Sequence, residues 1–346
     1  MKKSLVALAV LAASGAAMAQ SSVTLFGVVD AGYSVGNGSV SNSTAMRTDR
    51  IGSSRLGFRG VEDLGGGMRA EFWLEAGVAN DSGAGSATNS NNQAVTGLAS
   101  AGTQGLTFNR KSTVGLVGSM GEIRLGRDYS PQFYPDAQYD PFGTNGVASS
   151  LIAYGGGFAA VRASNMIAYH SPNVGGFTVM LGSYMGENNT GAAAGKAGDG
   201  NGIHVRYAKG PLALGIASST TKTGAATEVK TSTMGGSYNF GVATVVFNSN
   251  TVSNTGAVDL EGMMIGAMIP MAGGTLKFSN ASLKQGAAET KRNAVGYVMP
   301  LSKRTSLFAT YARNANSGGA NRALNGAVTG ANQASTGYDL GVNHTF

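Results

Sequence analysis

The 346-residue sequence contains no cysteine, so no disulfide and no cysteine-based metal site holds the fold together. Only 12% of its residues are charged, whereas ordinary soluble domains carry about 25%. A water-facing surface of the usual extent is therefore not expected. After residue 19, no apolar run reaches the roughly 18 residues that a membrane helix needs. These absences leave a chain that is poor in charge and has no helical membrane span.

Glycine is abundant, with 54 residues in the chain, about twice the usual share. High glycine, low charge and the lack of apolar helices together favour a β-barrel whose outer surface faces lipid.

The N-terminus has the pattern of a secretory signal peptide. Lys2 and Lys3 precede an apolar run over Leu5–Leu11, and a short A-x-A site ends at Ala19, before Gln20. We predict that residues 1–19 are removed and that residues 20–346 form one domain. Loss of the two lysines lowers the formal net charge from +7 to +5. Because the basic residues are scattered and the chain is exported, we predict no nucleic-acid partner.

Segments of about ten residues alternate apolar and polar side chains, which is the pattern of barrel strands. In Gly67–Val78, apolar residues alternate with Arg69, Glu71, Trp73 and Glu75. From Val23–Tyr33 to the end of the chain we count sixteen such segments. The sequence therefore predicts an all-β fold, a 16-stranded antiparallel transmembrane β-barrel.

Short and long connections alternate between these segments. Ser119–Gly121 is short, whereas Gly36–Ser53, Asp128–Ala163, Thr220–Lys230 and Lys284–Arg292 are interpreted as long loops. Short turns on one rim and long loops on the other are typical of the periplasmic and extracellular sides of such barrels.

The last ten residues, Gly337–Phe346, form an alternating segment that ends on an aromatic residue. A closed barrel pairs its last strand with its first and so leaves no free edge. We therefore expect this segment to pair with Val23–Tyr33.

Catalytic and metal-binding patterns are weak. His170, His204 and His344 stand alone, and neither cysteine nor a His-x-x-x-His pair is present. We predict no catalytic residues, no metal, no cofactor and no enzymatic activity.

The connection Asp128–Ala163 contains three prolines and several aromatic residues, among them Tyr129, Phe133, Tyr134, Tyr139 and Phe142. Long loops without regular structure are usually functional or disordered, and disordered loops avoid aromatics. We expect this loop to pack into the barrel interior, with Asp136 and Asp140 facing the pore. The alternative is a packed extracellular loop that stays outside the lumen.

Several basic residues occupy the polar side of their strands and so should point into the lumen. By the same alternation Lys111, and not Arg110, points inward unless a bulge intervenes. Glu71, Glu75 and Glu122 share the polar side and should form ion pairs with some of these basic residues. The inward arginines are Arg55, Arg59, Arg69, Arg124, Arg162 and Arg206.

The chain resembles the general porins of Gram-negative bacteria, in the branch found in betaproteobacteria and neisseriae. The stretches that carry the resemblance are Ser21–Tyr33, Ser53–Gly67, Asn109–Leu116, Gly121–Arg127 and Gly337–Phe346.

This resemblance implies a homotrimer, a third loop folded inward, and basic residues opposite that loop at Arg55, Arg110 and Arg162. It also implies that Phe346 is the signal read by the barrel-assembly machinery. His344 departs slightly from the pattern, because an aromatic residue is more usual there.

We predict a water-filled outer-membrane pore for passive diffusion of ions and small hydrophilic solutes, with mild anion preference. The alternatives are a channel specific for phosphate or organic acids, and a closed structural or adhesive barrel. Outer-membrane lipid and lipopolysaccharide are the further expected partners. The residues expected to set a positive potential at the neck are Arg55, Arg59, Arg110, Lys111, Arg124 and Arg162, opposed by Asp136 and Asp140.

Overall fold

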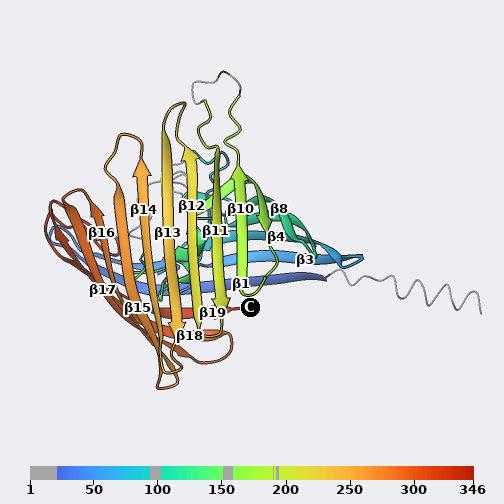
Figure 1. Ribbon diagram of the computed structural model, residues 1–346. Coiled ribbons are helices and arrows are strands. Elements are labelled where there is room, and N and C mark those ends of the chain that lie inside the picture. Colours follow the sequence, from blue (N-terminus) through green and yellow to red (C-terminus); the bar gives the residue numbers. More distant parts are fainter. Residues whose placement is uncertain (1–21, 94–102, 151–158, 190, 192–194) are drawn as a thin grey trace, which may run out of the picture.

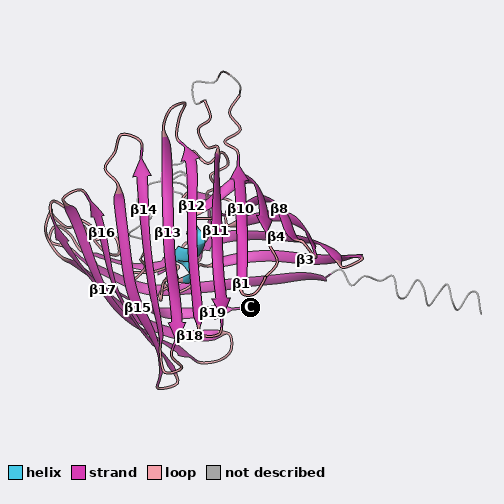
Figure 2. Ribbon diagram, viewed as in Figure 1, coloured by secondary structure: helices cyan, strands magenta, loops and turns pink. Residues whose placement is uncertain are grey.

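A computed structural model describes residues 22–93, 103–150, 159–189, 191 and 195–346. The predicted signal peptide lies outside the described residues. Nearly all of the regular structure is strand, as Figure 2 shows. No helix among the described residues is long and apolar enough to cross a membrane.

Sixteen long strands among the described residues form an antiparallel wall (Figure 1). Each pairs with the next along the chain, which confirms the predicted topology. The wall strands are β1 (Ser22–Asn37), β3 (Arg55–Gly65), β4 (Met68–Ala79), β7 (Lys111–Gly118), β8 (Gly121–Tyr129), β9 (Arg162–His170), β10 (Phe177–Tyr184), β11 (Gly200–Lys209), β12 (Leu212–Lys222), β13 (Glu228–Asn239), β14 (Thr244–Asn254), β15 (Leu260–Met271), β16 (Gly274–Gln285), β17 (Ala288–Pro300), β18 (Thr305–Ser317) and β19 (Ser335–Thr345).

Three shorter strands lie in the first two long connections. β2 (Ser43–Thr48) pairs with the part of β1 that extends beyond β3. β5 (Ala84–Ser86) and β6 (Thr103–Gln104) pair with each other, and β5 also pairs with β4. These connections therefore add local structure where the sequence predicted loops.

The barrel closes between its first and last strands. β1 pairs with β19 from Val28 opposite Thr345 to Asn37 opposite Thr336. Beyond β19, the backbone N–H groups of Gly27 and Phe346 each donate to the other's carbonyl at 3.1 Å. The closing pairing predicted from the sequence is confirmed, and it removes the edge that an open sheet would expose.

The two faces of the wall differ as expected for a barrel in lipid. On β18, Leu307 and Tyr311 point outward and are about two-fifths exposed, whereas Thr310 and Asn314 point inward and are buried. A soluble sandwich would bury its apolar face instead. The apolar outer surface therefore faces hydrocarbon.

The prediction of long loops is wrong at two connections in the C-terminal half. The connection of β16 to β17 has only two residues, Gly286 and Ala287, in place of the predicted Lys284–Arg292. Similarly, β12 continues to Lys222 and β13 begins at Glu228, where these two residues form an ion pair. Charged residues at these strand ends resemble loop sequence, because the strands extend past the apolar band into water.

The third long connection, between β8 and β9, folds into the barrel. Its helix α2 (Phe133–Gln138) lies inside the strand wall in Figure 2. Helix α2 contacts β12 and β13. The expectation of an inward loop is confirmed, and the alternative of a loop packed outside the lumen is wrong.

Inward-facing glycines on the wall make room for this loop. A Cβ at Gly215 would lie 3.1 Å from Tyr139 Cε2, and one at Gly266 would lie 2.4 Å from Pro141 Cγ. A larger side chain at these sites would push the loop toward the pore axis. The wall glycines in such contact are Gly182, Gly215, Gly235, Gly266, Gly296 and Gly337.

Buried polar contacts hold the loop to the same wall. Asn248 on β14 donates its side-chain N–H to Asp136 Oδ1 at 2.8 Å. The backbone N–H of Val147 donates to Asp339 Oδ2 on β19, also at 2.8 Å. Because buried hydrogen bonds to carboxylates are strong, the loop is fixed near both its helix and its tip.

We predict that Gly215→Val displaces the third loop. The added methyl groups would meet the ring of Tyr139, at a cost of about 1–3 kcal/mol for overpacking. Chymotrypsin should cleave the folded variant within the loop faster than the wild type, and single-channel conductance should change.

The matched control is Gly215→Val combined with Tyr139→Ala, which removes the clashing ring and should restore the conductance. A Gly215→Val variant with wild-type cleavage and conductance would contradict this account of how the loop is seated.

Candidate functional site

The third loop covers the inner wall from β10 to β19 and leaves β1, β3, β4, β7 and β8 uncovered. A cavity of about 550 Å³ lies against the uncovered wall. Its lining includes Arg55, Trp73, Glu75, Arg110, Lys111, Asp128, Tyr129 and Tyr134. The basic residues predicted from the sequence therefore gather on the side opposite most of the loop.

Strand register explains why these side chains share the lumen. Val28 lies opposite Arg55, Thr24 lies opposite Arg59, and Glu75 lies opposite Lys111. Directly paired residues point to the same face of a sheet. These side chains thus share the inward face of β1, β3, β4 and β7, in neighbouring rows.

Arg59 packs against aromatic rings instead of a carboxylate. Its guanidinium carbon lies 5.6 Å from the ring centre of Phe26 and 5.3 Å from that of Trp73. The two rings contact each other edge to face, with centroids 5.1 Å apart. Such cation–π contacts orient the guanidinium without neutralising its charge.

Glu75 is the carboxylate around which the first group of cations is arranged. Arg110 Nε donates to Glu75 Oε1 at 2.6 Å, and Arg55 Nη1 lies 3.8 Å from the same oxygen. Trp73 Nε1 donates to the other oxygen at 3.1 Å. One nearly buried carboxylate therefore balances two arginines.

Arg110 and Lys111 both reach the lumen, although strand alternation predicted this only for Lys111. Arg110 precedes β7, and its backbone N–H donates to the carbonyl of Glu75. Its side chain is thus free of the alternation that begins at Lys111. No bulge is needed to bring both cations to the same side.

Asp128 is the second carboxylate of the site and is almost fully buried. It lies 3.0 Å from Lys111 Nζ and 2.5 Å from Arg124 Nη1. Arg124 Nε also donates to Glu122 at 2.7 Å. The charge of Arg124 is therefore largely neutralised by these two carboxylates. Its main role is to link side chains of the wall.

Arg162 and Arg127 have no ion pair with any residue that the structure describes. The Arg162 guanidinium lies 4.8 Å from the Tyr129 ring centre, and its Nε is buried without a hydrogen-bond partner. Arg127 donates to the carbonyl of Asn89 at 3.1 Å and to Ser164 Oγ at 2.8 Å. Arg162 thus contacts Tyr129, which lines the cavity, whereas Arg127 is held by uncharged acceptors.

Sequence reasoning missed Arg127, because strand alternation turns it toward lipid. The structure buries Arg127, because its side chain donates to the carbonyls of Asn89 and Asn109 in the connection between β4 and β7. Gly126 has φ +121°, which is unfavourable for other residues. The pairing of β8 with β9 shifts register between Gly126 and Asp128, but Arg124 and Asp128 stay on the same side of β8. No local sequence signal marks the contacts of Arg127.

The expectation that Asp136 and Asp140 face the pore is not met by their positions, since both are buried. Asp136 contacts Asn248, and Asp140 accepts the backbone N–H groups of Phe142, Thr144 and Ser150. These carboxylates shape the loop. The loop presents Tyr134 to the cavity, and burial raises the pKa of its phenol, so this surface is neutral.

The remaining predicted residues lie away from this cluster. Arg69 pairs with Glu71 on β4, and Arg206 lies near Tyr139 under the third loop. His344 is exposed on the outer wall and contacts Thr305 Oγ1 at 2.9 Å. No group of His, Asp and Glu in the described part of the chain could hold a metal ion.

Comparison with known proteins agrees with this architecture. The family model described as Gram-negative porin matches residues 4–320. The chain is 38% identical to outer membrane porin protein 32 of Delftia acidovorans, over the whole of both chains. It is 29% identical to an outer membrane porin protein of Bordetella pertussis, over 91% of this chain and 95% of that one.

Among solved structures, the anion-selective porin from Comamonas acidovorans superposes with a TM-score of 0.82 and 32% identity. The superposition covers 94% of this chain and 100% of that one. The resemblance inferred from the sequence is thereby confirmed: the chain belongs to the Gram-negative porin family.

Proposed function

We propose that this outer-membrane porin is mildly anion-selective and that residues 20–346 form the mature pore. The observation that carries the proposal is the charge imbalance on the uncovered wall. The carboxylates that pair with cations around the cavity are Glu75, Glu122 and Asp128. The six cations that accompany them are Arg55, Arg59, Arg110, Lys111, Arg124 and Arg162.

The mechanism is electrostatic and requires no turnover or energy coupling. Uncompensated cations raise the local concentration of anions in a narrow aqueous passage and lower that of cations. Most carboxylates here are engaged by arginine or lysine, so a permeating anion meets guanidinium groups. The third loop sets the size limit from the opposite side. A lined cavity supports an open lumen over the closed structural barrel.

A second candidate is a channel specific for phosphate or organic acids. The observation that favours it is that two arginines beside the cavity, Arg59 and Arg162, have no ion pair among the described residues. Guanidinium groups bind carboxylates and phosphates through paired hydrogen bonds, which gives geometric preference as well as charge.

The further partners follow from the same fold. We propose a homotrimer with outer-membrane lipid and lipopolysaccharide around it, and no catalytic activity. Phe346, which closes the ladder against Gly27, is proposed as the signal for the barrel-assembly machinery.

The first test of the pore is the reversal potential of planar bilayers in a KCl gradient. Wild-type protein should favour Cl⁻. The double variant Arg55→Glu with Arg59→Glu should lower the Cl⁻/K⁺ permeability ratio roughly three- to tenfold, because potentials of several kT act over the passage. Arg304→Glu, on an exposed turn at the opposite rim from the long loops, is the control. A wild-type reversal potential that favours K⁺ would contradict the proposal.

Uptake by liposomes separates the general pore from the specific channel. Swelling rates in neutral sugars, chloride, phosphate and a dicarboxylate are compared for wild type and Arg162→Gln. A general pore loses rate for all anions in similar proportion. If phosphate or dicarboxylate transport alone collapses, the specific channel replaces the general one.

Deletion of Phe346 should damage assembly far more than conduction. The deletion removes two backbone hydrogen bonds of the seam and the ring that covers Gly27. We expect much less folded protein in the outer membrane, while the pores that do form conduct normally. Normal insertion of the deletion variant would refute the assigned role.

A further inference from the structure

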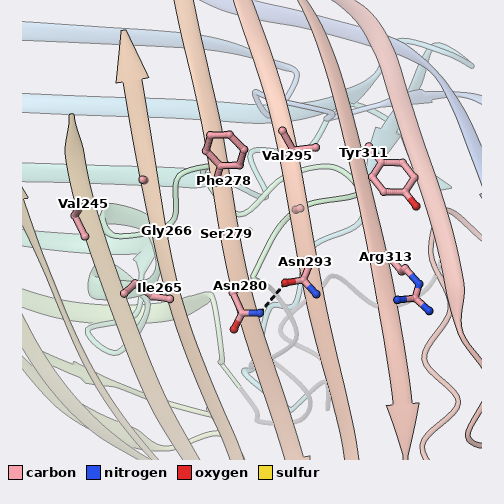
Figure 3. Close-up of a pocket in the computed structure, with 12 residues that line it drawn as sticks. Val245, Ile265, Gly266, Phe278, Ser279, Asn280, Asn293, Val295, Tyr311 and Arg313 are labelled. Carbon is pink, nitrogen blue, oxygen red and sulfur yellow. Dashed lines mark hydrogen bonds between the residues drawn. The ribbon is translucent and has the colours of Figure 1, made fainter. Parts of the chain in front are cut away.

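A groove of about 750 Å³ lies on the outer wall across β14 to β18 (Figure 3). Its apolar side chains are Val245, Ile265, Phe278, Val295 and Tyr311. Ile265, Phe278 and Tyr311 are between 40% and 58% exposed in the single chain. This groove faces away from the lumen and takes no part in the pore described above.

A row of polar side chains borders the apolar part of the groove. Asn280, Asn293 and Arg313 are cross-strand neighbours on β16, β17 and β18, next to the row Phe278, Val295 and Tyr311 (Figure 3). Asn280 Nδ2 donates to Asn293 Oδ1 at 2.7 Å. The groove is therefore amphipathic, with apolar and polar parts side by side.

The polar row marks the edge of the apolar band on the side of the long loops. On β16 the outward side chains change from Leu276 and Phe278 to Ser282 and Lys284 on passing Asn280. On β17 they change from Tyr297 and Val295 to Lys291 and Glu289 on passing Asn293. The 17-residue connection from β18 to β19 leaves from this same rim. The row thus lies at the level of the outer-leaflet headgroups.

Arg313 differs from the neighbouring lysines at this level in its lack of a charged partner among the described residues. Lys284 and Lys291 lie 3.8 Å and 3.7 Å from the carboxylate of Glu289. The side chain of Arg313 makes no hydrogen bond or ion pair with any residue that the structure describes. An outward arginine close to hydrocarbon is unfavourable unless an anion or water solvates it.

We propose that this groove binds a phosphorylated lipid of the outer leaflet. The acyl chains lie over Phe278, Val295 and Tyr311, and a phosphate accepts hydrogen bonds from Arg313 and Asn293. Guanidinium and phosphate form charge-assisted, paired hydrogen bonds, which an amide at the next position can supplement. The inference refines the lipid partner proposed above. It depends on the barrel lying in the outer membrane and not on the selectivity of its pore.

Native mass spectrometry of the folded, full-length mature protein in detergent tests the site. The probes are diphosphorylated lipid A, its monophosphorylated form and phosphatidylcholine. Arg313→Gln should weaken binding of diphosphorylated lipid A about fivefold, the effect of one basic residue at an anionic surface. Arg304→Gln, an identical change on the opposite rim, should leave binding unchanged. Val295→Trp, which fills the groove without changing charge, should also weaken binding.

Two results would overturn the site. One is equal retention of diphosphorylated lipid A by Arg313→Gln, Arg304→Gln and wild type. The other is loss of oligomer stability in Arg313→Gln with unchanged lipid binding, which would assign Arg313 to a contact between subunits. Bilayer conductance and ion preference of Arg313→Gln should match wild type, so a failure here is distinct from a failure of the pore proposal.

Discussion

The hydrogen-bonded seam between β1 and β19 is the interaction on which the rest of the structure depends. Backbone N–H and C=O groups have no partner in hydrocarbon, so a sheet in a membrane must close on itself. Here the ladder runs from Val28 opposite Thr345 to Asn37 opposite Thr336, and the backbone of Phe346 completes it against Gly27. Closure fixes which residues face the lumen on every strand.

The lumen created by closure is then divided by the third loop. The loop follows wall positions that lack side chains, such as Gly215 and Gly266, and is attached by Asn248 and Asp339. Its acidic residues are used for these internal contacts. As a result, the passage has a basic wall on one side and a largely neutral, aromatic surface on the other, which produces an asymmetric but net positive environment.

The outer face of the same strands contacts lipid instead of water. Its apolar side chains face lipid, and polar residues begin where the hydrocarbon ends. The groove at Phe278 and Arg313 lies at that transition. The pore and the lipid groove are therefore on opposite faces of one sheet. Successive residues of a strand point alternately to the two faces.

The sequence by itself determined the barrel, its closure and the inward direction of Arg55, Arg59 and Lys111, because these depend on strand alternation and on the need to satisfy every backbone group. It did not predict the burial of Arg127, because the carbonyls that this side chain binds, those of Asn89 and Asn109, belong to a connection distant in sequence. It also misplaced the carboxylates of the third loop and the length of the connection after Gln285. Only the tertiary structure decided which charges are neutralised, since an ion pair such as that of Arg110 with Glu75 depends on contacts between residues 35 positions apart, which no local pattern encodes.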